Sequence, residues 1–321
     1  MMKTMKTMKN LNRTECLQFL KEHDGYLLVT HIRPDGDTLG SAAALCHILR
    51  RMGKTAYLND NPQTTAKYAP YTAPYIAPAG YEPACVVGVD LASERLYPIG
   101  LPEDTRFDLC IDHHPTNTGY AERLWCLPEK ASCGELILYL AQDLNLLDKT
   151  VADLLYIAVS TDCGCFVYAN TTAETHRAAA ELFEAGADYR PLNITLFRQV
   201  SFSRLMLEGL IFASMRSYAD GALIVATVTR EMMERAGATE DDTDDLASLA
   251  GRVEGSYVAV TIRELGDKEC KLSLRSGEKF DSSAICALHG GGGHRMASGC
   301  SIYEDVDTTR EIIVREILEA L

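Results

Sequence analysis

Residues 26–37 read YLLVTHIRPDGD, an apolar run followed at once by a histidine and two aspartates. The run at 26–30 is short and mostly aliphatic, which is typical of a buried strand. In an open parallel sheet, ligands bind beyond the carboxyl ends of the strands. His31, Asp35 and Asp37 are therefore expected at the edge of a sheet where a ligand would bind.

Two later segments repeat this order. The apolar residues 85–89 precede Asp90, and residues 107–111 precede a DHH triplet at 112–114. Each segment alone would more often be an ordinary turn, because Asp and Gly are common turn residues. Together with Asp162, however, they place more acids in one crevice than could coexist without cations. The pattern therefore predicts two divalent metal ions, which in such sites usually catalyse hydrolysis of phosphoryl esters.

The rest of the first half alternates strand-like and helix-like segments. A further strand is predicted at 55–58, and helices are predicted at 38–52, 133–144 and 151–160. This alternation predicts an α/β fold with a mostly parallel sheet and helices on both faces. Residues 69–83 are rich in Pro, Tyr and Ala and fit either an irregular loop or a short broken helix.

A second α/β pattern begins near residue 221. Its predicted strands are 222–229, 257–263, 270–274 and 299–303, and its predicted helices are 242–251, 281–288 and 308–318. Residues 191–215 form an amphipathic run without strand-like segments, which indicates a helical linker. The chain is thus expected to have a first domain at 1–190, with 1–10 disordered, a linker at 191–215 and a smaller α/β domain at 216–321.

The amino-acid composition of the chain limits the kinds of partner that it can bind. The 31 basic and 45 acidic residues give a formal net charge of −14, which argues against a grip on long duplex nucleic acid. No apolar stretch approaches the roughly 18 residues of a membrane span, so no membrane partner is expected. The 11 cysteines lack Cys-x-x-Cys spacing, so neither structural zinc nor a disulfide framework is predicted. A reducing, cytoplasmic location fits best.

The motifs of the first half resemble those of the DHH phosphoesterases. The triplet at 112–114 is similar to the motif that names this family. HIRPDGD at 31–37, followed by LGS at 39–41, resembles its first motif. Residues 88–90 and 161–162 resemble the second and fourth motifs, and their order and spacing agree as well.

LRS at 274–276 and GGGGH at 290–294 resemble the associated DHHA1 domain. The likeness then covers nearly all of the chain after about residue 20. A run of glycines is more often a flexible hinge. Here it follows a predicted helix, so a close backbone approach to an anion is the favoured interpretation. The resemblance implies that this domain binds substrate through Arg275, Ser276, Gly291, Gly292, Gly293 and His294.

The resemblance also implies roles in the first domain. The implied metal ligands are His31, Asp35 and Asp90 for one ion and Asp37, Asp90, His113 and Asp162 for the other. Asp90 would bridge the two ions, because metals roughly 3.5–4 Å apart need a shared carboxylate. The implied catalytic groups are Asp90, His114, which would contact the scissile phosphate or protonate the leaving oxygen, and Asp112, which would orient an imidazole.

Carboxylate and imidazole ligands suit Mn²⁺, with Mg²⁺, Co²⁺ or Zn²⁺ as alternatives. Within the family, the chain resembles the branch of nanoRNases and pAp phosphatases. That branch implies an exoribonuclease-like hydrolase of short oligoribonucleotides and of 3′-phosphoadenosine 5′-phosphate. A phosphodiesterase of cyclic di-AMP or linear dinucleotides, a non-catalytic nucleotide-binding module, and a homodimer stay open. Val167 departs from the family pattern, because many relatives carry a basic residue near that position.

Overall fold

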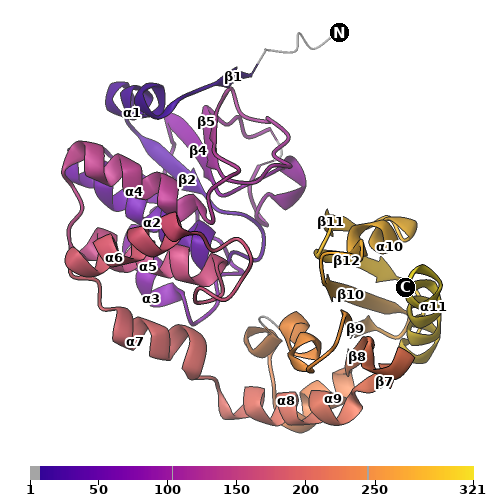
Figure 1. The fold of residues 1–321 in the computed structure, drawn as a ribbon. Helices are drawn as coiled ribbons and strands as arrows, with labels where there is room; N and C mark the ends of the chain where they lie inside the picture. Colours follow the sequence, from indigo (N-terminus) through magenta and orange to yellow (C-terminus); the bar gives the residue numbers. More distant parts are fainter. Residues whose placement is uncertain (1–7, 103, 244–245) are drawn as a thin grey trace, which may run out of the picture. The chain divides into compact units, whose positions relative to one another are not determined.

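The computed structural model of the chain describes residues 8–102, 104–243 and 246–321 (Figure 1). The chain divides into two compact units between Gln199 and Val200. Each unit contains one six-stranded sheet and its own hydrophobic core. Among the described residues, no helix combines the length and the apolar character needed to cross a bilayer.

The sheet of the first unit is parallel, as the sequence predicts. Its strands lie in the order β1-β6-β5-β4-β2-β3. The strands are β1 (Lys9–Asn10), β2 (Tyr26–Val29), β3 (Ala56–Leu58), β4 (Cys85–Val89), β5 (Leu109–Asp112) and β6 (Arg123–Cys126). Every neighbouring pair is parallel, so the carboxyl ends of β2, β4 and β5 lie at the same edge.

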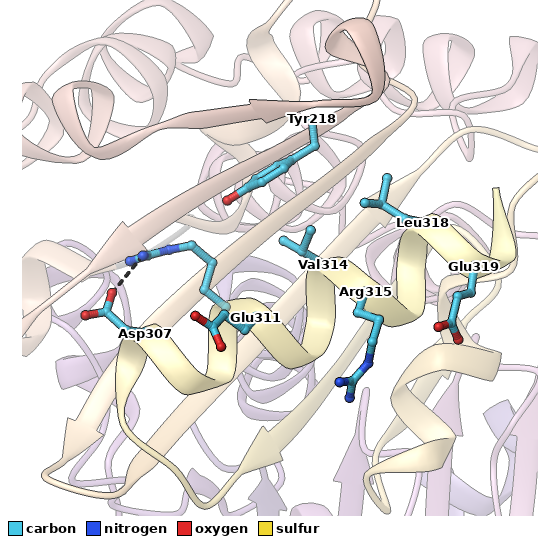
Figure 2. Close-up of a pocket in the computed structure, with 8 residues that line it drawn as sticks. Tyr218, Asp307, Glu311, Val314, Arg315, Leu318 and Glu319 are labelled. Atoms are coloured by element: carbon cyan, nitrogen blue, oxygen red, sulfur yellow. Dashed lines mark hydrogen bonds and ion pairs between the residues drawn. The ribbon is translucent and has the colours of Figure 1, made fainter.

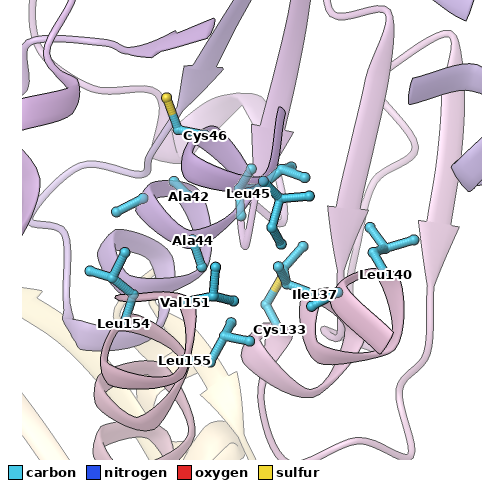
Figure 3. Close-up of a cluster of buried hydrophobic side chains, with 14 of the residues drawn as sticks. Ala42, Ala44, Leu45, Cys46, Cys133, Ile137, Leu140, Val151, Leu154 and Leu155 are labelled. Carbon is cyan, nitrogen blue, oxygen red and sulfur yellow. The ribbon is translucent and has the colours of Figure 1, made fainter. Parts of the chain in front are cut away.

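Helices pack on one face of this sheet. They are α1 (Arg13–Glu22), α2 (Gly36–Arg51), α4 (Cys133–Leu144), α5 (Lys149–Asp162) and α6 (Ala173–Glu184). Figure 3 shows the centre of the core, where Leu45 of α2, Ile137 of α4 and Leu155 of α5 are buried together. A Cβ on Gly40 would lie 2.5 Å from the Leu154 carbonyl oxygen. Glycine at this position therefore lets α2 approach α5 closely.

The opposite face is covered by irregular segments, so the prediction of helices on both faces is wrong for this unit. Val86 and Leu124 point to this face and belong to a second, smaller core cluster. Among the described residues between β4 and β6, the helical structure is limited to a 3₁₀ turn at Glu94–Leu96. Pro98 and Pro102 lie in the same stretch, and proline interrupts helices because it lacks an N–H and clashes with the preceding turn.

Two stretches of the first unit, 1–10 and 69–83, bear on the predictions of disorder and of a loop or broken helix. Residues 1–10 are predicted to be disordered; of these, 1–7 lie outside the described residues. Lys9–Asn10 forms the edge strand β1 and pairs with β6, a pairing that two polar residues do not signal in the sequence. Within 69–83 the chain forms α3 (Ala69–Thr72) and a 3₁₀ turn (Ala73–Tyr75), which is the broken helix of the two alternatives.

The sheet of the second unit is mixed, in the order β11-β12-β10-β9-β8-β7. Its strands are β7 (Arg216–Tyr218), β8 (Leu223–Val228), β9 (Val258–Gly266), β10 (Glu269–Ser276), β11 (Gly292–His294) and β12 (Ala297–Ile302). β8 and β9 are parallel, and the other neighbours are antiparallel. The four predicted strands are present, whereas the short edge strands β7 and β11 are not anticipated by apolar periodicity.

Helices cover both faces of this second sheet. They are α8 (Phe202–Ser214), α9 (Arg230–Ala236), α10 (Ser282–Leu288) and α11 (Val306–Ala320). α10 and α11 contribute to the core cluster on one face, and α8 and α9 contribute to the cluster on the other. The predicted linker at 191–215 contains the end of α7 (Tyr189–Asn193), a π-helical turn (Ile194–Arg198) and α8.

The predicted helix at 242–251 is wrong. The described residues there form 3₁₀ turns at Glu240–Thr243, Leu246–Ser248 and Ala250–Arg252, while 244–245 lie outside the described residues. The Asp242 carboxylate accepts a hydrogen bond from the backbone N–H of Thr239 at 2.8 Å. Such local bonds from Asp to the backbone compete with regular helix.

Candidate metal centre

The six predicted ligands come together at the carboxyl edge of the first sheet. His31 lies just beyond β2, Asp90 directly follows β4, His113 directly follows β5, and Asp162 ends α5. Three overlapping groups have potential ligand atoms within 4.8 Å of one another: His31, Asp35 and Asp90; Asp37, His113 and Asp162; and Asp90, His113 and His114. Parallel strands and one helix end therefore bring together residues that are distant in the sequence.

Asp90 belongs to two of these groups. It is only 3% exposed, and its φ of 55° lies in the left-handed region, which Asp tolerates better than most residues. Its Oδ1 lies 3.4 Å from His113 Nε2, and its Oδ2 lies 3.9 Å from His31 Nε2. Each oxygen of this one carboxylate thus faces a different imidazole.

Main-chain carbonyls orient both imidazoles. His31 Nδ1 donates to the Ile32 carbonyl at 2.8 Å, and His113 Nδ1 donates to the Lys130 carbonyl at 3.1 Å. Because a carbonyl oxygen can only accept, each Nδ1 carries a proton, and in the neutral ring Nε2 has the lone pair. Both Nε2 atoms face carboxylates, which is the arrangement that a metal-binding histidine requires.

Asp35 and Asp37 serve two different helix ends. Asp35 is the N-cap of α2, where its Oδ1 accepts from the backbone N–H groups of Asp37 and Thr38 at 3.0 and 3.1 Å. The Asp37 carboxylate instead accepts from the first N–H groups of α4, those of Cys133 and Gly134, at 2.7 and 3.0 Å. Two acids separated by one glycine therefore point to different parts of the cluster.

Close packing of α2 on α5 positions Asp162. A Cβ on Gly36 would lie 2.3 Å from Thr161 Oγ1, so the glycine between the two acids is needed for this approach. The Asp162 Oδ2 lies 3.6 Å from His113 Nε2. Asn170 Nδ2 donates to the Asp162 carbonyl at 3.1 Å and to a carbonyl in the loop before α4 at 3.0 Å. Asn170 thus ties the end of α5 to the loop that orients His113.

Asp112 supports His114. Its Oδ1 accepts from His114 Nδ1 at 2.8 Å and from the backbone N–H of His113 at 2.8 Å. Its Oδ2 accepts from Asn117 Nδ2 at 2.5 Å. Both oxygens of this fully buried carboxylate are therefore used within the protein. The His114 ring is held through Nδ1, which leaves Nε2 as its atom for contact with a substrate.

The crowding of acids changes pKa values across the cluster. Burial, followed by the charges of Asp90 and Asp162, raises the pKa of Asp37 well above its usual value. Burial also raises the pKa of Asp162 to about 7. For His113, burial acts in the opposite direction, but the closeness of the Asp90 carboxylate and the charge of Asp37 raise its pKa to about 11. Without a cation, the cluster therefore holds protons at neutral pH.

Two buried atoms of the cluster, Asp90 Oδ1 and His113 Nε2, have no hydrogen-bond partner. Leaving a buried polar atom unpaired costs roughly 1–3 kcal/mol, so such atoms call for a functional explanation. These two lie 3.4 Å apart and are of the types that divalent metals bind. The donor set therefore fits divalent cations.

We expect Mn²⁺ to bind more tightly at about pH 8 than at about pH 6, because a cation must displace protons from the cluster. Asp162, with a pKa of about 7, loses its proton across this interval, and His113, with a pKa of about 11, keeps one until metal binds. Calorimetry in buffers of different ionisation enthalpy measures the protons released. Equal affinity at both pH values with no proton release would contradict this linkage.

The predicted substrate-binding residues lie in the second unit, on β10 and the β11–β12 hairpin. His294 pairs with Ala297, and Ala297 pairs with Arg275 on the next strand. Paired residues of antiparallel neighbours point to the same face, so His294 and Arg275 share a face, and both are exposed. The Ser276 hydroxyl lies 3.4 Å from the Arg295 carbonyl and thus contacts the hairpin itself.

The glycine run forms part of this tight hairpin. A Cβ on Gly291 would lie 2.2 Å from the Gly299 carbonyl oxygen, and Gly293 has a φ of 139° with its Cβ position 2.6 Å from the Ala297 carbonyl oxygen. Only glycine fits at these two positions. Nothing lies within 4 Å of a Cβ on Gly292, so packing within the chain does not explain that glycine.

A pocket of about 740 Å³ lies between Tyr218 of β7 and one side of α11 (Figure 2). Its lining mixes apolar side chains, such as Leu318, with an ion pair of 2.7 Å between Arg310 and Asp307. It contains none of the predicted site residues, and its mixed charges do not indicate a particular ligand.

The fold and the cluster define a class of two-unit α/β proteins with potential metal ligands gathered at one edge of a parallel sheet. The model of the DHH family, N-terminal domain, matches residues 26–159, and the model of the DHHA1 domain matches residues 220–320. The chain therefore belongs to the DHH phosphoesterase family and carries a DHHA1 domain, which confirms the resemblance seen in the motifs.

Two curated relatives are named bifunctional oligoribonuclease and PAP phosphatase NrnA. The protein from Thermus thermophilus is 33% identical over 310 residues, covering 95% of this chain and 93% of its own. The protein from Bacillus subtilis is 29% identical, covering 91% and 93%. The crystal structure of an exopolyphosphatase-related protein from Bacteroides fragilis has a TM-score of 0.83 at 24% identity, covering 96% of this chain and 95% of its own. This likeness confirms the fold.

Three residues that support the cluster lie outside the set predicted from the sequence: Asn117, Lys130 and Asn170. Asn117 lies three residues beyond His114, and a polar side chain so close to the triplet is a signal for a supporting role. Lys130 acts through its backbone carbonyl, which every residue has, so no side-chain pattern could indicate it. Asn170 lies in a loop whose contact with Asp162 depends on the tertiary fold.

Proposed function

We propose that the protein is a metal-dependent phosphoesterase that hydrolyses short oligoribonucleotides and 3′-phosphoadenosine 5′-phosphate. The observation that carries this proposal is the buried cluster in which Asp90 Oδ1 and His113 Nε2 face each other at 3.4 Å without a hydrogen-bond partner. Carboxylates and imidazoles in this arrangement suit a pair of divalent cations. The names of the two curated relatives, which match at least 91% of this chain, support the substrate class.

Two cations bound here would activate water as the nucleophile and neutralise charge on the phosphate. The ligands we propose are His31, Asp35 and Asp90 for one ion and Asp37, Asp90, His113 and Asp162 for the other. The imidazoles of His31 and His113 are already oriented without metal, because they donate to the Ile32 and Lys130 carbonyls. Mn²⁺ is the proposed ion, with Mg²⁺, Co²⁺ and Zn²⁺ as the alternatives to be compared.

His114 is the proposed group that protonates the leaving oxygen or hydrogen-bonds the scissile phosphate. Burial lowers its pKa, but the hydrogen bond to Asp112 and the charge of Asp90 outweigh burial, so that the pKa is raised. A raised pKa keeps the imidazolium form available as an acid at neutral pH. Asp112, held by Asn117, orients the ring so that Nε2 can reach the substrate.

For the second unit we propose substrate binding by the face that carries Arg275 and His294. These two side chains lie in one row across β10, β12 and β11 with only Ala297 between them. A guanidinium forms strong charge-assisted bonds with phosphate. The open surface at Gly292 would allow the substrate to approach the strand backbone, and Gly291, Gly293 and Ser276 would shape the hairpin beneath it.

Arg275→Ala is expected to lower kcat/KM on a dinucleotide about 10- to 150-fold, because a charge-assisted contact contributes roughly 1.5–3 kcal/mol. Bis-p-nitrophenyl phosphate, which is too small to use this contact, should lose much less. Lys268→Ala is the matched control, since Lys268 is exposed in the turn before β10, at the end of that strand away from Arg275. Equal losses on both substrates would mean that Arg275 supports the fold and not the substrate.

A substrate panel with saturating Mn²⁺ tests the proposed function. It contains RNA from dinucleotides to strands of about two helical turns, together with pAp and cyclic and linear dinucleotides. We expect high kcat/KM on RNA of a few nucleotides and on pAp, and lower values on long strands, because a chain of net charge −14 repels them. Rates that rise with length would indicate a processive nuclease, and a preference for cyclic di-AMP would indicate the alternative phosphodiesterase. Nucleotide binding without turnover would indicate a non-catalytic module.

We also propose a cytoplasmic location. All 11 cysteines are free, and most of them are buried as small apolar side chains. Free cysteines in this number are typical of a reducing compartment.

A further inference from the structure

Helix α8 has an outer face without any charge. Phe202, Leu205, Met206 and Phe212 are 78%, 55%, 47% and 44% exposed, and Ala213 on the same face is exposed as well. A helix on a protein surface normally places charged or polar residues on its outer side. The outer side of α8 instead has the composition of an interface.

The charged side chains of α8 lie away from this outer face and interact within the second unit. Arg204 forms an ion pair of 2.7 Å with Glu208 and donates to the Asp242 carbonyl at 2.8 Å. On its inner side, the helix buries Leu207 and Ile211 completely in the core against the second sheet. Both faces of α8 are therefore apolar, but only the inner one has a partner within this unit.

Gly209 lies in the middle of the exposed face. A Cβ at this position would meet nothing within 4 Å, so no contact inside the chain requires glycine. Glycine inside a helix costs roughly 0.8–1.0 kcal/mol relative to alanine. No packing contact within the chain requires glycine at position 209, but the missing side chain would let the backbone of another molecule approach α8 closely.

We propose that α8 pairs with α8 of a second copy of this chain, antiparallel and crossing at Gly209. A two-fold axis at Gly209 places Met206 opposite Phe212 and Leu205 opposite Ala213 of the other copy, since each pair is equally far from position 209. Sulfur packs favourably on an aromatic ring, and a large side chain fits against a small one. The exposed face is thus complementary to itself, as a two-fold interface requires.

The absence of charge on this face argues against phosphates and nucleic acid as its ligands, and the complementarity of the face to itself about Gly209 favours a second copy of this chain. One helix face buries less than the roughly 800 Å² per partner of a typical stable interface, so we expect a dimer that dissociates on dilution. This inference concerns α8 alone and does not depend on the proposed function.

Light scattering after size exclusion, over a concentration series, measures the mass. We expect it to rise from 35.3 kDa toward twice that value. Met206→Lys and Gly209→Leu should each raise the dissociation constant at least about tenfold, while both monomers stay folded because the two positions are exposed. Leu318→Lys, at an exposed leucine on α11, is the matched control and should change nothing. A monomer at every concentration, or equal effects of all three substitutions, would overturn the proposal.

Cysteine cross-linking tests the register. Gly209→Cys places two thiols at the proposed axis, and mild oxidation should link the two copies. Ala213→Cys is the matched control: its two copies would be eight helical positions apart, about 12 Å at 1.5 Å per residue, beyond the reach of a disulfide. Cross-linking at Ala213→Cys but not at Gly209→Cys would overturn the pairing at Gly209.

Discussion

Asp90→Asn is expected to lower the turnover of a dinucleotide at least about 1,000-fold. The two oxygens of Asp90 face His113 and His31, so this one carboxylate is proposed to serve both cations. Metal ions supply several kcal/mol of charge stabilisation in such reactions, and each 1.4 kcal/mol lost corresponds to about tenfold in rate. Steady-state kinetics with Mn²⁺ measures the effect.

The fold of this variant should survive. Asn adopts the left-handed backbone conformation of position 90 as readily as Asp does. The substitution also removes one of the charges that raise the pKa values of Asp37 and Asp162. We therefore expect an unchanged or higher Tm without metal and weaker Mn²⁺ binding by calorimetry, which distinguishes a lost ligand from unfolding.

Asp143→Asn is the matched control for Asp90→Asn. Asp143 lies near the end of α4 remote from Cys133 and forms a partly exposed ion pair of 2.7 Å with Arg13. Its loss should cost less than about 1 kcal/mol of stability and leave turnover unchanged. Wild-type turnover and Mn²⁺ affinity in Asp90→Asn would show that Asp90 does not bridge the metals.

His114→Ala is expected to lower kcat about 100- to 10,000-fold, the usual contribution of a general acid. Mn²⁺ affinity should change little, because His114 Nδ1 is occupied by Asp112. Rapid quench on a dinucleotide measures the chemical step. His23→Ala is the matched control, since His23 precedes β2 and lies at the opposite end of that strand from the cluster.

The pH profile separates an acid from a structural residue. If His114 donates a proton, the rate should fall as pH rises above its pKa. The hydrogen bond to Asp112 helps to raise this pKa, so Asp112→Asn should move the alkaline limb to lower pH. A slower variant with an unshifted profile would indicate that Asp112 only maintains the fold.

The sequence alone predicted four of the six strands of the first unit, β2 to β5, and placed the candidate metal ligands other than Asp162 beyond three of them. An apolar run of strand length can be recognised locally, because burial on both faces demands aliphatic side chains. Once β2, β4 and β5 are parallel neighbours, the residues that follow them must lie at one edge of the sheet. His31, Asp90 and His113 therefore come together as a consequence of strand order.

Only the tertiary structure decided how these side chains are held. Asp37 caps α4 from a position 97 residues away from Gly134, and the Lys130 carbonyl orients His113. Backbone groups are identical in every residue, so such contacts leave no pattern in the sequence. The edge strands β1, β7 and β11 were missed for a related reason: each has two or three residues, and neighbouring backbone, not apolar side chains, holds them in place.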